Sequence, residues 1–97
     1  MPEILFHKKA ENEIEEIIDY YNMINPALSS GFVAEIEKML ISISTFPESF
    51  EQVSLNIRRA NMKRFPFGIY FNYNHDLVKI LLVRHYKRKK YIGTDRI

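Results

Sequence analysis

The spacing of hydrophobic residues changes near residue 50, and this change constrains the fold more than any other feature of the chain. Between residues 10 and 45, apolar side chains recur every three or four positions, as on one face of an α-helix. From residue 55 onward they alternate with a period of two, as on one face of a β-strand. Helical segments grouped before strand segments predict an α+β domain, in which helices pack on one face of a sheet.

The helical half divides in two at Asn25-Pro26. An apolar stripe from Ile14 to Tyr21 predicts a first helix over residues 10–24. Asn is a good helix cap and Pro is favoured at the first helical position, so a second helix is expected over residues 26–45. It should end at Phe46-Pro47, because the residue before a proline disfavours the α conformation. The very short link predicts that the two helices form an antiparallel hairpin.

Four strands are expected around this hairpin. One covers residues 3–7, and the others lie near 55–62, 67–73 and 77–85. Asn74, His75 and Asp76 predict a three-residue loop between the last two strands. The order β-α-α-β-β-β predicts a two-layer domain, with the helical hairpin on one face of a mostly antiparallel sheet. The sheet neighbour of the first strand is left open, and residues 86–97 are expected to fray after a short element.

Length and composition indicate a single domain over residues 1–97. The hydrophobic fraction of 46% and the charged fraction of 27% are ordinary for a globular protein. The chain has no cysteine, no glycine-rich phosphate loop and no histidine pair at metal-binding spacing, so no cofactor and no metal are expected. No apolar run approaches the ~18 residues that a membrane span needs. Since no secretory leader is recognised either, a cytoplasmic protein without membrane contact is expected.

Charge is distributed unevenly along the chain. Residues 1–51 hold three cations and ten carboxylates, a net charge of −7. Residues 52–97 hold eleven cations and two carboxylates, a net charge of +9. The two halves either attract each other within the fold or give the molecule a basic face for a polyanion or an acidic protein. We expect most of the cations on the open face of the sheet or at its rim.

Three basic groups are the candidate site. Arg58, Arg59, Lys63 and Arg64 precede an aromatic strand, Arg84-His85-Tyr86 ends the last strand, and a run of cations from Lys87 follows. In a meander, the loop before one strand and the end of the next lie at the same rim. Convergence there is therefore expected of Arg64, Arg84, His85 and Arg88. Such a site suits phosphate, because arginine clamps its oxygens and histidine transfers protons near neutral pH. The alternative is a solvated basic rim.

Several of these segments together resemble the RelE/ParE superfamily of toxins from type II toxin–antitoxin systems. The resemblance rests on the helix IEEIIDYY, the Phe-Pro after the second helix, the strand RFPFGIYF and the ending VRHYKR, and it covers nearly the whole chain. It implies a small toxin that is neutralised by a cognate antitoxin. RelE-like members cut mRNA on the ribosome at a metal-free site, whereas ParE-like members inhibit DNA gyrase.

Two departures from the RelE-like pattern favour the ParE-like branch. Gly68 stands where those proteins tend to carry an arginine, and Tyr86 stands where a second arginine tends to follow the residue matching His85. A missing transition-state donor of this kind can be worth ~3 kcal/mol. We therefore expect a toxin that acts by binding gyrase rather than by catalysis. A ribosome-dependent endoribonuclease is the first alternative, and a non-toxic binding module with the same fold is the second.

The expected site follows from this resemblance. For target binding, we expect Arg58, Arg59, Lys63, Arg64, Arg84, Lys87 and Arg88. For the nuclease alternative, whose partners are the ribosome and mRNA, the candidates are Arg64, Arg84, His85, Tyr86 and Arg88. The oligomeric state is left open between a single chain, a homodimer and a toxin–antitoxin assembly.

Overall fold

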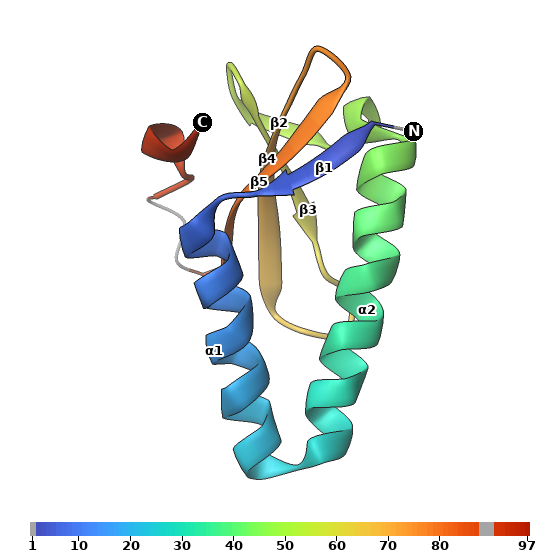
Figure 1. Ribbon diagram of the computed structural model, residues 1–97, viewed down its shortest axis with the longest axis vertical. Coiled ribbons are helices and arrows are strands. Elements are labelled where there is room, and N and C mark those ends of the chain that lie inside the picture. Colours follow the sequence, from blue (N-terminus) through green and yellow to red (C-terminus); the bar gives the residue numbers. More distant parts are fainter. Residues whose placement is uncertain (1, 88–90) are drawn as a thin grey trace.

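The computed structural model describes residues 2–87 and 91–97, in which two long helices pack on a five-stranded sheet (Figure 1). In chain order the elements are β1 (Glu3–Phe6), α1 (Lys8–Ile24), α2 (Pro26–Thr45), β2 (Glu51–Ser54), β3 (Ile57–Asn61), β4 (Phe67–Asn74) and β5 (Leu77–His85). Short 3-10 turns cover Pro47–Ser49 and Thr94–Arg96. The sheet order is β1-β5-β4-β3-β2, with β1 parallel to β5 and every other pair antiparallel. The first strand therefore lies beside the last.

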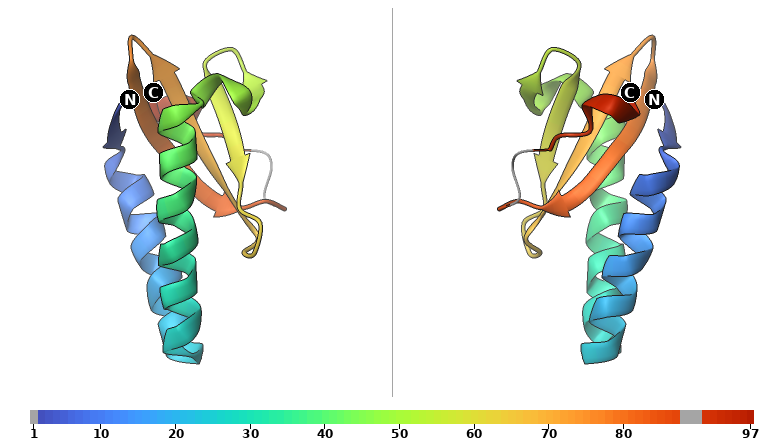
Figure 2. Two further views of the ribbon diagram at one scale, coloured as in Figure 1. Left: turned by 90° about the vertical axis from the view of Figure 1, so that its right-hand side faces the viewer. Right: turned by 90° about the vertical axis from the view of Figure 1, so that its left-hand side faces the viewer.

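The predicted helical hairpin is confirmed, and its ends have local causes. The side chain of His7 caps α1, because its Nδ1 accepts a hydrogen bond from the Lys9 amide at 3.1 Å, and the helix begins two residues earlier than predicted. Asn25 caps α2 through a 2.9 Å bond from the Ala27 amide, and the bounds of α2 are those predicted. Both helices cover the same face of the sheet and extend beyond it (Figure 2). Within the described residues, no helix has the length and apolar character needed to cross a membrane.

The strand predicted near residues 55–62 is confirmed as β3, but it is preceded by β2, a strand that was not predicted. Leu55 and Asn56 form a turn between β2 and β3, and the Gln52 side-chain amide donates to the Leu55 carbonyl at 2.8 Å. The first strand of this hairpin, β2, was missed because it is a four-residue edge strand with little apolar alternation. The sheet therefore has five strands rather than four.

The loop between β4 and β5 is tighter than predicted. Asn74 still pairs with Leu77, so only His75 and Asp76 lie outside the ladder. Both have positive φ angles, 51° and 60°. Two successive left-handed residues are typical of a type I′ turn, whose twist matches that of an antiparallel hairpin.

A bulge in β5 divides the buried residues between two cores. Tyr70 pairs with Leu82 and Phe71 pairs with Ile80, so Leu81 is the extra residue. The larger core lies between the sheet and the helices and includes Phe32, Ile36, Ile69, Phe71 and Ile80. The smaller one lies on the opposite face, which we call the open face, and consists of Ile57, Tyr70, Leu81 and Leu82.

The end of the chain covers this smaller core. Tyr91 and Ile92 pack against it, and Gly93 is buried with a left-handed φ of 89°. The short element expected near the end of the chain is the 3-10 turn at Thr94–Arg96, and residues 91–97 lie across the open face (Figure 2). The reason is the bulge, which turns two consecutive leucines onto that face and creates apolar surface that needs a cover.

Candidate functional site

The segment between β3 and β4, residues 62–66, carries two of the predicted site residues and is called the basic loop here. Its anchor is Phe65, which is 7% exposed. The Phe65 ring meets those of Tyr21 at 5.3 Å and Phe32 at 5.6 Å between centroids, in edge-to-face geometry. Because Tyr21 belongs to α1 and Phe32 to α2, this ring joins the basic loop to both helices.

The backbone of the basic loop is held by Glu35, which lies on α2. Its carboxylate accepts hydrogen bonds from the Lys63 amide at 2.5 Å and from the Arg64 amide at 3.1 Å. At the base of the loop, the Met62 amide donates to the Phe67 carbonyl at 2.8 Å. The loop is therefore fixed at its base, at its apex and through Phe65.

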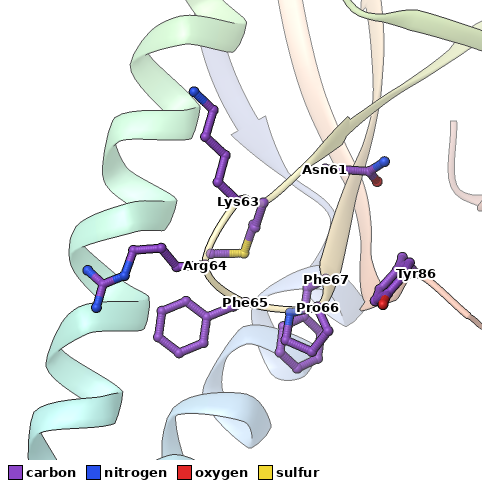
Figure 3. Close-up of a pocket in the computed structure, with 8 residues that line it drawn as sticks. Asn61, Lys63, Arg64, Phe65, Pro66, Phe67 and Tyr86 are labelled. Carbon is purple, nitrogen blue, oxygen red and sulfur yellow. The ribbon is translucent and has the colours of Figure 1, made fainter.

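The cationic side chains of the basic loop are exposed and point in different directions. Both side chains, Lys63 and Arg64, are exposed, and Arg64 extends toward α2 with its guanidinium 6.0 Å from the centre of the Phe65 ring (Figure 3). A cavity of about 390 Å³ lies beside the loop and is lined by residues 61–67 and Tyr86. The lining of this cavity includes no carboxylate. An anionic group that enters this cavity therefore meets two cations and no carboxylate in its lining.

Arg58 and Arg59 stabilise the sheet, and they do so on opposite faces. Arg58 pairs with Phe71 on the helix-facing side, where its Nη1 donates to the Phe50 carbonyl at 2.8 Å. Arg59 pairs with Tyr70 on the open face and forms a 2.7 Å ion pair with Glu51. The predicted group of four neighbouring cations is thus divided, because successive residues of a strand point to opposite faces.

Arg84 lies on the open face beneath the end of the chain. Its guanidinium is 5.5 Å from the centre of the Tyr91 ring, and that of Arg96 is 5.3 Å from the same centre. Burial raises the pKa of Tyr91, and a hydrogen bond from its hydroxyl to Asp95 raises it further. The same hydrogen bond lowers the pKa of Asp95. This cluster therefore holds the last residues against the sheet.

His85 faces the helices instead. Its ring lies 5.9 Å from that of Phe67 and stacks on Tyr86 at 5.1 Å, and its Nδ1 accepts a hydrogen bond from the Lys87 amide at 3.2 Å. Arg84 and His85 both border a cavity of about 530 Å³ along α1, but Glu13 and Glu16 line it too. This lining is of mixed charge, so the cavity suits a phosphate less well than the one beside the basic loop, whose lining has no carboxylate.

The predicted convergence of Arg64, Arg84 and His85 is found only in part, because Arg84 and His85 border one cavity and Arg64 lines another. The three residues lie at the same end of the sheet, but Arg64 is directed toward α2 and Arg84 toward the end of the chain on the open face. Of the cations expected on the open face or at its rim, Arg58 lies on the helix-facing side instead, and Arg64 lies in the loop between β3 and β4 at the rim. Lys87 is exposed just beyond β5. Arg88 lies outside the described residues, so its part in the expected site stays a prediction.

Glu35 is the neighbour of the site that sequence reasoning missed, whereas Tyr91 was expected near the site but as a group that stacks on a base. Glu35 precedes the residues whose amides it binds by 28 and 29 positions, and no local pattern indicates such a contact. Tyr91 follows a run of cations and has no apolar periodicity. Among the residues that the structure describes, no three acidic, histidine or cysteine side chains are grouped as a metal site requires.

Comparison with known proteins agrees with the fold and with the resemblance. The chain resembles a solved structure described as the chromosomal ParDE TA system from P. aeruginosa, with a TM-score of 0.75 and 19% sequence identity. The match covers 88% of this chain and 96% of the other, and at this identity it shows the fold alone. No curated protein matches this sequence. The model of the family described as "ParE toxin of type II toxin-antitoxin system, parDE" matches residues 4–90. The chain therefore belongs to the ParE toxin family of type II toxin–antitoxin systems.

Proposed function

We propose that this toxin arrests growth by binding DNA gyrase, and that a cognate antitoxin of the ParD kind neutralises it. The observation that carries the proposal is the match to the ParE toxin family over residues 4–90. The departures at Gly68 and Tyr86 support the same branch. Gly68 is buried on the open face, where a Cβ would lie only 3.1 Å from Asn61 Oδ1 and 3.4 Å from Arg59. An arginine at this position would displace both neighbours.

The basic loop is the part of the expected site that best suits a protein target. Lys63 and Arg64 are exposed and line a cavity whose lining has no carboxylate. Tyr86 lines the same cavity, and the next residue in the chain, Lys87, is exposed. Charges at such a rim steer an acidic partner and set its orientation. Arg58 and Arg59 are already engaged by the carbonyl of Phe50 and the carboxylate of Glu51, so we assign them to the fold. Arg84, on the open face, remains a candidate for target binding. Arg88 remains one too, although it lies outside the described residues.

A supercoiling assay with purified gyrase tests the proposal. The wild-type toxin should inhibit supercoiling, and equimolar antitoxin should restore it. The variant K63A/R64A should inhibit much less while unfolding at the same temperature as the wild type, because both side chains are exposed. R58A is the matched comparison, since losing its bonds to backbone carbonyls should lower stability first.

The same experiment can exclude the proposal. If wild-type toxin at large molar excess leaves gyrase active, gyrase is not the target. Mapping of mRNA ends in arrested cells then tests the nuclease alternative, which predicts cuts in phase with codons. Expression without growth arrest would instead support the non-toxic binding module.

A further inference from the structure

The contacts between Glu35 and the basic loop are unexpected. It is an acidic residue beside two cations, and the simplest arrangement would be an ion pair with one of them. Instead both carboxylate oxygens face backbone amides, with Lys63 N 2.5 Å from Oε2 and Arg64 N 3.1 Å from Oε1. The ion pairs found in residues 2–87 and 91–97 lie elsewhere and join Arg59 to Glu51 and Arg96 to Glu13.

This arrangement organises the backbone while leaving the side chains for an external partner. A carboxylate that accepts amide hydrogen bonds makes charge-assisted contacts, which are stronger than those between neutral groups. The Glu35 carboxylate oxygens are directed at the two amides, and the ion pairs of the described residues include neither Lys63 nor Arg64. The two cationic side chains therefore stay exposed on a loop whose backbone is fixed.

The rest of the loop does not replace this contact. Phe65 holds the C-terminal part between the helices, and the bond from Met62 to Phe67 holds the base. Residues 63 and 64 lie between these anchors and are both exposed. Without Glu35 their amides would be left to water, and this part of the loop would populate other conformations.

We propose that Glu35 is a positioning residue, which holds the basic loop in the conformation that binds an acidic surface of the toxin's protein target. The inference rests on the proposed function in one respect, namely that Lys63 and Arg64 contact the target. When only a fraction of the toxin molecules has the binding-competent loop conformation, the apparent affinity for the target is reduced by that fraction. Loss of Glu35 should therefore weaken target binding even though Glu35 does not touch the target.

A double-mutant cycle tests this role. E35A alone should reduce gyrase inhibition by roughly tenfold, the effect of a loop that is competent about one tenth of the time. In the K63A/R64A background, E35A should have little further effect, because there are no cations left to position. E37A is the matched control, since Glu37 is an exposed carboxylate on the same helix, and it should behave as wild type.

Two further readouts separate positioning from general stability. Amide hydrogen exchange at Lys63 and Arg64 should accelerate in E35A, while exchange in β4 and β5 stays slow. E35Q keeps one carbonyl acceptor and should restore part of the activity lost in E35A. If E35A leaves exchange at both amides unchanged, or weakens K63A/R64A as strongly as the wild type, Glu35 does not act through this loop and the proposal fails.

Growth arrest keeps this test independent of the target's identity. The same cycle is run with arrest of growing cells as the readout. If gyrase is not inhibited but the cycle in cells still shows coupling between Glu35 and the two cations, the proposed target is wrong and the positioning role stands. If gyrase is inhibited but the cycle shows no coupling, the proposed target stands and the positioning role of Glu35 is wrong.

Discussion

Gly31 lowers the stability of the fold, and its contacts do not require the absence of a side chain. It lies within α2, where glycine is less favourable than alanine because it loses more backbone entropy. A Cβ there would lie 3.6 Å from Phe65 Cζ and 3.9 Å from Arg64 Nη2, which are ordinary contact distances. We expect G31A to raise the free energy of unfolding by about 0.5–1 kcal/mol, measured by urea denaturation.

Gly68 is the control for this prediction. A Cβ at Gly68 would lie 3.1 Å from Asn61 Oδ1, so G68A should gain nothing or lose stability. Equal stabilisation by both substitutions would show that the contacts at the two positions do not decide the outcome.

Tyr91 and Asp95 make a prediction about pH at the scale of single residues. Burial raises the pKa of Tyr91 above its ordinary value of 10.0, and the bond to Asp95 contributes less. D95N should therefore lower the Tyr91 pKa without returning it fully to 10.0, as followed by the NMR shift of the Tyr91 ring. No change in the Tyr91 pKa on this substitution would contradict the hydrogen bond.

The signs of the two shifts define when this cluster stabilises the fold. A raised tyrosine pKa means that its contribution is complete below pH 10 and is lost as the pH rises through the raised pKa. The pKa of Asp95 is lowered from 3.8, so its contribution is present above that pH and is lost as the pH falls through the lowered pKa. Residues 91–97 should therefore be held most firmly between these limits.

Among the elements, the basic loop depends on Phe65 for its attachment to the hairpin. The ring is 7% exposed and touches both helices, so F65A should cost about 3–5 kcal/mol in the free energy of unfolding. Chemical denaturation monitored by circular dichroism measures the loss. M23A is the comparison, because Met23 is 88% exposed at the end of α1 and should change stability by less than about 0.5 kcal/mol. A small effect of F65A would mean that the helices close over the vacated space.

The edge of β5 shows how the sheet is closed where β1 ends. β1 pairs with residues 77–80, and within residues 2–87 and 91–97 no strand pairs with the next part of β5 on that side. Glu13 of α1 accepts a hydrogen bond from the Val83 amide at 3.1 Å, and Arg96 donates to the Leu81 carbonyl at 2.9 Å. Because Glu13 and Arg96 are also paired with each other at 2.9 Å, one contact ties α1, β5 and the end of the chain together.

For the whole molecule, the uneven charge should appear in the kinetics of association. If the exposed cations of the basic loop bind an acidic target as proposed, they should steer it over distances near the Debye length, about 8 Å at physiological ionic strength. The association rate with the target should fall as salt is added, as measured by surface plasmon resonance. In K63E/R64E the rate should be lower and its salt dependence weaker. An unchanged salt dependence in this variant would place the steering charges elsewhere.

The helical hairpin could be predicted closely because its signals are local. The Asn25-Pro26 break and the apolar stripes act within one or two turns of helix, and the bounds of α2 follow from them. The long strands β4 and β5 were likewise recognisable from their alternation. The edge strand β2, the bulge at Leu81 and the cover provided by residues 91–97 were not, because each depends on a neighbour that is distant in sequence.

The candidate site divides along the same line. Residue types and family resemblance indicated a basic toxin surface, since charge and motif are properties of the chain that need no fold to be seen. Which cations are exposed, which are engaged in the sheet, and which faces they occupy could not be derived in this way. The direction of a side chain depends on strand register and on partners such as Glu35 and Tyr91, and these contacts form only when distant segments pack together.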